Sequence, residues 1–150
     1  MKAFISIGVI VLLHLVAFVF IQLNPQSKII FYTPLNLLIC FFLLNFNHDD
    51  YNKKILLFSF IVFTSGFFIE LIGVSSGVIF GHYEYGKVLG PKFLNVPVII
   101  GINWFILIYC SGNITQRLKT TAFLKSIIGA SLLVLFDCIL EIVAVKFGLW

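Results

Sequence analysis

The stretch ILLFSFIVFTSGFFIELIG, residues 55–73, decides the fold. At about 1.5 Å per residue it is long enough to cross, or nearly cross, the hydrocarbon of a bilayer, and Glu70 is its only charged residue. The rest of the chain is similar, because 61% of its 150 residues are hydrophobic, 11% are charged and the mean hydropathy is +1.12. Such a composition cannot cover a soluble globule with polar surface, so the sequence predicts an integral membrane protein.

Five apolar stretches of this kind predict an all-α, polytopic bundle of about five transmembrane helices, forming a single membrane domain over residues 1–150. We expect the spans at residues 3–23, 29–46, 55–73, 93–112 and 126–147. The first is not a cleaved signal peptide, because its apolar run is too long and no small-residue cleavage site closes it. Six basic residues on the N-terminal face of the bundle against four on the other favour a cytoplasmic N-terminus. These are Lys2, Lys53, Lys54, Arg117, Lys119 and Lys125, against Lys28, Lys87, Lys92 and Lys146.

The charged and metal-ligating residues exclude several classes of function. The net charge of +4 is spread over loops without a run of like charges, so we expect no nucleic-acid partner and contact with membrane lipids instead. The three cysteines, Cys40, Cys110 and Cys138, are isolated within predicted spans and indicate neither a disulfide framework nor a zinc site. No metal site is expected, because paired-histidine and Glu-x-x-His spacings are absent and Asp-x-x-x-Glu alone is a weak magnesium signal.

Three carboxyl groups inside the predicted spans are the first candidates for function: Glu70, Asp137 and Glu141. An ionisable side chain in hydrocarbon is costly unless it faces the protein interior, has partners or stays protonated. Spans three and five run in the same direction, so all three acids fall in one leaflet. Asp137 and Glu141 are four residues apart on one helix face and cannot both ionise comfortably there, so we expect them to titrate as a coupled pair that keeps one proton. The alternative is that Lys146 or Lys87 neutralises one of them.

The segment between spans three and four, residues 74–94, is the most unusual in the chain. Five glycines and one proline between Gly73 and Pro91 argue against a regular helix. If its middle is extended, one face carries His82 and Glu84 and the opposite face carries two tyrosines, Tyr83 and Tyr85. The simpler interpretation is an interfacial aromatic belt with solvated charges.

The glycines favour a different structure, an interfacial or re-entrant loop that folds back over a pocket in the leaflet of the acids. Asn103 and Trp104 lie in the adjoining half of span four, so we expect them in the same pocket.

Several short motifs in this half of the chain resemble the carotenoid biosynthesis membrane protein family, which includes bisanhydrobacterioruberin hydratase and the carotenoid 1',2'-hydratases. They are Glu70-Leu-Ile-Gly73, Gly77-Val-Ile-Phe-Gly81-His-Tyr83-Glu-Tyr85, Leu89-Gly90-Pro91, Val96-Pro97 and Asn103-Trp104. The resemblance covers roughly residues 70–150. It departs from the family at Ile142, where relatives usually have proline after the second acid. Relatives continue beyond the position of Trp150 into further spans, which leaves a chain that lacks these C-terminal spans as one alternative.

The resemblance implies addition of water to the terminal carbon-carbon double bond of an acyclic carotenoid, giving a tertiary alcohol without a cofactor. It implies a polyene substrate, other membrane enzymes of the carotenoid pathway as partners, and the inner (plasma) membrane of a prokaryote as location. The alternatives are a polyene cyclase or isomerase that uses the same protonation, and a non-enzymatic lipid or proton carrier.

Hydration needs a proton donor, a site that tolerates a tertiary carbocation, and a held water molecule. We expect one of the three intramembrane acids to deliver the proton, and another carboxylate, with His82 or Glu84, to position the water. The aromatic faces of Tyr83, Tyr85 and Trp104 would stabilise the cation.

Overall fold

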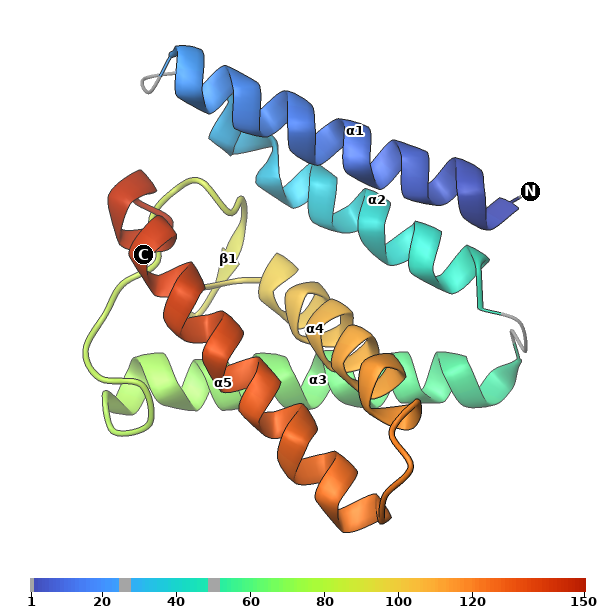
Figure 1. Ribbon diagram of the computed structural model, residues 1–150. Coiled ribbons are helices and arrows are strands. Elements are labelled where there is room, and N and C mark those ends of the chain that lie inside the picture. The colour runs from blue at the N-terminus through green and yellow to red at the C-terminus, as the bar shows by residue number, and fades with distance from the viewer. Residues whose placement is uncertain (1, 25–27, 49–51) are drawn as a thin grey trace.

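The computed structural model describes residues 2–24, 28–48 and 52–150 and confirms the all-α bundle (Figure 1). Its helices are α1 (Lys2–Leu23), the short 3₁₀ helix η1 (Lys28–Tyr32), α2 (Thr33–Phe46), α3 (Lys53–Ser76), α4 (Ile99–Gln116) and α5 (Ala122–Phe147). Two short strands, β1 (Lys92–Phe93) and β2 (Val96–Pro97), pair antiparallel between α3 and α4.

Four segments within the described residues are long and apolar enough to cross a membrane: α1, η1 with α2, α3 and α5. The chain is therefore a membrane protein. The expected span at residues 93–112 corresponds to α4, which is not among these four. Its 18 residues extend only about 27 Å and include Asn103 and Asn113.

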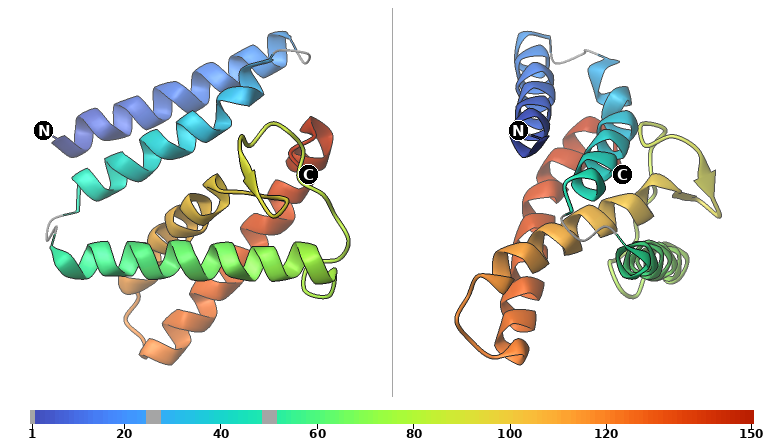
Figure 2. Two further views of the ribbon diagram at one scale, coloured as in Figure 1. Left: turned by 180° about the vertical axis from the view of Figure 1, so that it is seen from behind. Right: turned by 90° about the vertical axis from the view of Figure 1, so that its right-hand side faces the viewer.

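Helix α4 lies at the centre of the bundle and contacts α2, α3 and α5. Figures 1 and 2 show α1 and α2 as an antiparallel pair beside α4, and the side view in Figure 2 shows α3 and α5 on different sides of α4. Helix α1 is peripheral, since Ser6 is its only buried residue. Two side-chain hydrogen bonds join it to α2: Asn47 donates to the Ser6 hydroxyl at 2.7 Å, and Asn36 Nδ2 donates to His14 Nε2 at 3.4 Å.

Capping side chains extend spans three and five beyond their expected starts. Asn52 Oδ1 accepts from the backbone N–H of Lys54 at 2.8 Å, so α3 begins at Lys53 and not at residue 55. Thr121 Oγ1 accepts from the N–H of Leu124 at 3.3 Å, so α5 begins four residues earlier than the expected 126. Both are ordinary N-cap contacts, which satisfy N–H groups that have no partner within the helix.

The second span is divided in two. Residues 28–32 form a 3₁₀ turn, and the α-helix begins only at Thr33, with Pro34 in its first turn. Proline has no N–H to donate and suits that first turn, so it marks the true start of α2.

The fourth span was predicted wrongly at its beginning, because residues 92–97 form a hairpin and α4 starts at Ile99. The turn consists of Leu94 and Asn95, whose φ values are +48° and +70°. Two positive φ values in succession are typical of a type I′ turn, which suits the twist of a two-stranded hairpin. Asparagine adopts this conformation readily but leucine does not, so in the sequence only Asn95 indicates the turn.

The glycine-rich loop is also shorter at its start than expected. Helix α3 continues to Ser76 and ends at Gly77, whose φ of +65° and N–H bond to the Gly73 carbonyl at 2.9 Å close the helix. The connection is therefore residues 77–98, including the hairpin.

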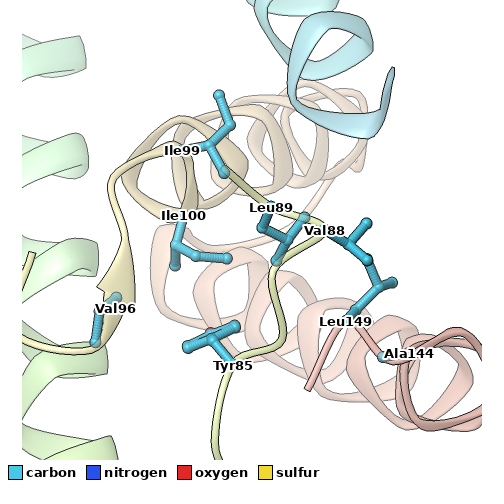
Figure 3. Packing of buried hydrophobic residues seen from close by; sticks show 8 residues of the cluster. All are labelled: Tyr85, Val88, Leu89, Val96, Ile99, Ile100, Ala144 and Leu149. Carbon is cyan, nitrogen blue, oxygen red and sulfur yellow. The ribbon is translucent and has the colours of Figure 1, made fainter. Parts of the chain in front are cut away.

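This connection is packed into the bundle. A cluster of buried side chains joins the loop, the start of α4 and the end of α5 (Figure 3). Its members are Tyr85, Val88, Leu89, Val96, Ile99, Ile100, Ala144 and Leu149. The packing holds the loop against α4 and α5 at the end of the bundle where α3 and α5 finish, and this is where the predicted site residues lie.

Candidate functional site

Glu70 is the centre of a hydrogen-bonded cluster. It lies on α3, is only 6% exposed, and accepts hydrogen bonds on both carboxyl oxygens. The phenol hydroxyls of Tyr83 and Tyr85 donate to Oε1, and the indole Nε1 of Trp104 donates to Oε2 at 3.3 Å. A buried carboxyl group is stable only with such partners, and here they come from the loop and from α4.

The two phenols are held as neutral donors. Burial first, and then the charge and hydrogen bonding of Glu70, raise the pKa of Tyr83 and of Tyr85 well above the usual tyrosine range. Their rings pack edge to face with centroids 5.4 Å apart. Two aromatic surfaces therefore lie beside one carboxyl group.

The extended alternation expected for the middle of the loop is present. Tyr85 is buried and Tyr83 half-buried against Glu70, while His82 and Glu84 are exposed. Asn103 lies half-buried on α4, one residue before Trp104.

The two acids of α5 lie differently from the expected arrangement, because Asp137 and Glu141 are exposed on the helix and only Glu70 is buried. Glu141 Oε2 accepts a hydrogen bond from the indole of Trp150 at 2.8 Å, and the Trp150 ring packs edge to face on Tyr85 at 5.8 Å between centroids. Asp137 lies one helical turn before Glu141 on the same face of α5. The pair on α5 therefore borders the Glu70 cluster and does not form its interior.

A close backbone contact fixes the loop to the end of α5. The N–H of Gly86 donates to the Leu149 carbonyl at 2.8 Å. A side chain at position 86 would place its Cβ 2.0 Å from the Gly148 carbonyl oxygen, so only glycine fits. Leu149 itself is nearly buried and its N–H donates to the Ala144 carbonyl at 2.9 Å.

A cavity of about 450 Å³ adjoins the cluster on the loop side. It is lined by Val74, His82, Tyr83, Glu84, Tyr85, Lys92 and Asn95. The ammonium group of Lys92 donates to the backbone carbonyl of Tyr85. The cavity is thus surrounded almost entirely by polar side chains.

Four residues of the cluster and its cavity were not foreseen as site residues: Val74, Lys92, Asn95 and Trp150. Lys92 counted only as a loop charge, and Val74 lies four residues after Glu70, on the same face of α3. The spacing of Val74 was the one signal in the sequence that could have identified its position.

Residues 26–150 match the sequence profile of a family described as "Carotenoid biosynthesis protein". The chain belongs to this family. The match begins well before residue 70, where the motif resemblance starts, and it covers α2 to α5 with the whole Glu70 cluster, while α1 lies outside it. Members of the carotenoid biosynthesis family act in making carotenoids, so the substrate is a polyene. No curated protein and no solved structure matches the chain significantly.

Proposed function

We propose that this member of the carotenoid biosynthesis family is a hydratase, which adds water to the terminal double bond of an acyclic carotenoid. A carboxylic acid transfers its proton to the less substituted alkene carbon, and the π electrons form the new C–H bond. The resulting tertiary carbocation bonds to a water oxygen, and the oxonium proton passes to a carboxylate. The net change is the addition of one water molecule, without oxidation or reduction.

The observation that carries the proposal is the buried Glu70 carboxyl group with three aromatic residues around it. A developing carbocation is stabilised by a fixed negative group and by the faces of aromatic rings, most strongly where water is scarce. Tyr83, Tyr85 and Trp104 supply the rings, and their donor groups point at Glu70 and hold it in place.

We assign the proton acceptor role from the hydrogen bonds of Glu70 and the donor role from the position of the acids on α5. Both oxygens of Glu70 already accept hydrogen bonds, so it suits the role of the acceptor that balances the cation and removes the proton from the attacking water. Glu141 holds the indole of Trp150. Asp137, one helical turn before Glu141 on the same face of α5, is the acid that we assign as proton donor. His82 and Glu84, which line the polar cavity, orient the water.

The test is expression in a host that accumulates lycopene, followed by mass analysis of the pigments. Glu70→Gln and Asp137→Asn should each lower the yield of hydroxylated carotenoid by about 100-fold or more, the usual scale for removing an acid or base. Ser65→Ala, on an exposed face of α3, is the matched control and should keep the wild-type yield.

Full hydration in all three variants Glu70→Gln, Asp137→Asn and Glu141→Gln would remove the proposal. A new pigment of unchanged mass would indicate a cyclase or isomerase instead. Loss of both kinds of product on substitution of Glu70, with lycopene unchanged, supports catalysis by the cluster.

A further inference from the structure

The polar cavity beside the Glu70 cluster does not suit the polyene itself. Six of its seven lining residues are polar or charged in part of their side chain, and Val74 is the exception. An apolar hydrocarbon chain would leave His82, Glu84 and Lys92 without water, at a large desolvation penalty. The cavity suits water, and several lining side chains are exposed at the surface, so it is open to the solvent side.

The cavity leads directly to the proposed reaction centre. Val74 lies one helical turn after Glu70, on the same face of α3, and lines the cavity. Tyr83 and Tyr85 also line it, and their hydroxyls reach the Glu70 carboxyl group. Two of the lining residues therefore contact the buried acid directly, and a third lies one helical turn from it.

We propose that this cavity is a water vestibule: it supplies the water that captures the carbocation, whereas the polyene approaches from the exposed face of α5 that carries Asp137. This inference rests on the proposed hydratase function. Lys92 donates to the Tyr85 carbonyl in the wall of the vestibule, and Val74 lines it one helical turn from Glu70. Two different sides of the cluster then serve the two reactants, one polar and one apolar.

If water reaches the cation only through the vestibule, the vestibule controls how much of the cation becomes alcohol and how much returns to polyene. If the vestibule is filled, the acid still protonates the alkene, but the cation finds no water. It then loses a proton from an adjacent carbon to the carboxylate and returns to an alkene. In D₂O the carboxylic acid carries deuterium, so each such return can leave deuterium in the recovered polyene. Deuterium exchange therefore reports protonation, and alcohol formation reports capture by water.

The experiment uses the full chain in membranes with lycopene and D₂O, and measures alcohol and deuterated lycopene by mass. Val74→Phe, which fills the inner end of the vestibule, should lower the ratio of alcohol to exchanged lycopene roughly tenfold. Ile72→Phe adds the same bulk to an exposed face of α3, 52% exposed in the wild type, and should leave the ratio unchanged. Lys92→Met, which removes the ammonium group and keeps the length, should shift the ratio in the same direction as Val74→Phe.

Thermal melting in detergent shows whether each variant is folded, and the product ratio is compared only for folded variants. If Val74→Phe does not fold, Val74→Leu is used in its place. An unchanged ratio in a folded Val74 variant would overturn the vestibule. Absence of both alcohol and exchange in the wild-type protein would instead contradict the hydratase function.

Discussion

At the scale of single residues, the site depends on one buried acid and the groups that point at it. Because the pKa values of the two tyrosines are raised in the folded protein, the stability of the fold depends on pH. An unfolded tyrosine titrates near pH 10, and the folded pKa of Tyr83 and Tyr85 lies higher. A group with a raised folded pKa stabilises the fold fully below its unfolded value, and this stabilisation is lost as the pH rises toward the folded value.

We therefore expect the melting temperature in detergent to fall as the pH rises above about 10, because the unfolded chain releases phenol protons that the folded chain keeps. Tyr85→Phe should make this fall shallower. Tyr32→Phe, at a tyrosine that is 65% exposed and outside the cluster, is the control. An equally steep fall in Tyr85→Phe and in the wild type would show that the phenol is not held by Glu70.

Trp150 gives a second prediction for single residues. Trp150→Phe keeps a ring against Tyr85 but removes the indole N–H that reaches Glu141. We expect a loss of hydration of roughly tenfold or more, since one hydrogen bond to a charged group contributes about 1.5 kcal/mol or somewhat more. Trp150→Ala removes both contacts and should lose more.

The pH dependence of hydration separates a positioning role from a purely structural one. If Glu141 is oriented by Trp150, the pH profile of Trp150→Phe should differ from that of the wild type. An identical profile and yield would mean that the contact has no role in the reaction.

At the scale of elements, the loop and the end of α5 form one unit, and Gly86 is the point where they meet. Gly86→Ala would force a Cβ into the Gly148 carbonyl, so we expect a loss of about 1–3 kcal/mol of stability and release of the loop. Gly112→Ala, in α4, meets nothing within 4 Å and should be neutral or stabilising, because alanine favours a helix. Thermal melting of the two variants in detergent compares them directly, and equal melting temperatures would contradict the contact.

Apolar length was enough to predict the bundle, and alternation was enough to place Tyr83 and Tyr85 opposite His82 and Glu84. The hairpin was missed because its turn depends on Leu94 adopting a conformation that its sequence does not favour.

The exposure of Asp137 and Glu141 was missed for a different reason. The i, i+4 spacing places two acids on one face of a helix, but it does not say what that face meets. The contact of Trp150 with Tyr85 joins residues 65 positions apart in the chain, and no local pattern encodes it.

At the scale of the whole molecule, helix α4 decides on which side of the membrane the loops lie. If α4 crosses the bilayer, the loop of residues 77–98 and the connection between α4 and α5 emerge on opposite sides. In a variant without the native cysteines, Val78→Cys should then react with a membrane-impermeant maleimide from outside the cell, and Phe123→Cys only after the membrane is opened. Both positions are strongly exposed, at 84% and 76%.

This assignment uses the cytoplasmic N-terminus that the basic residues favour. Labelling of both cysteines from the same side would show that α4 does not cross. Labelling of each from the side opposite to that expected would keep the crossing and reverse the orientation.

The position of Glu70 in the chain has a consequence for biogenesis. Chains are synthesised from the N-terminal end, so α3 enters the bilayer while the partners of its acid are still being made. Trp104 follows 34 residues later, and Leu149, which anchors the loop, follows later still. An unpartnered carboxyl group makes the insertion of α3 into lipid energetically unfavourable. Insertion of the helix that carries Glu70 therefore depends on segments that are synthesised after it.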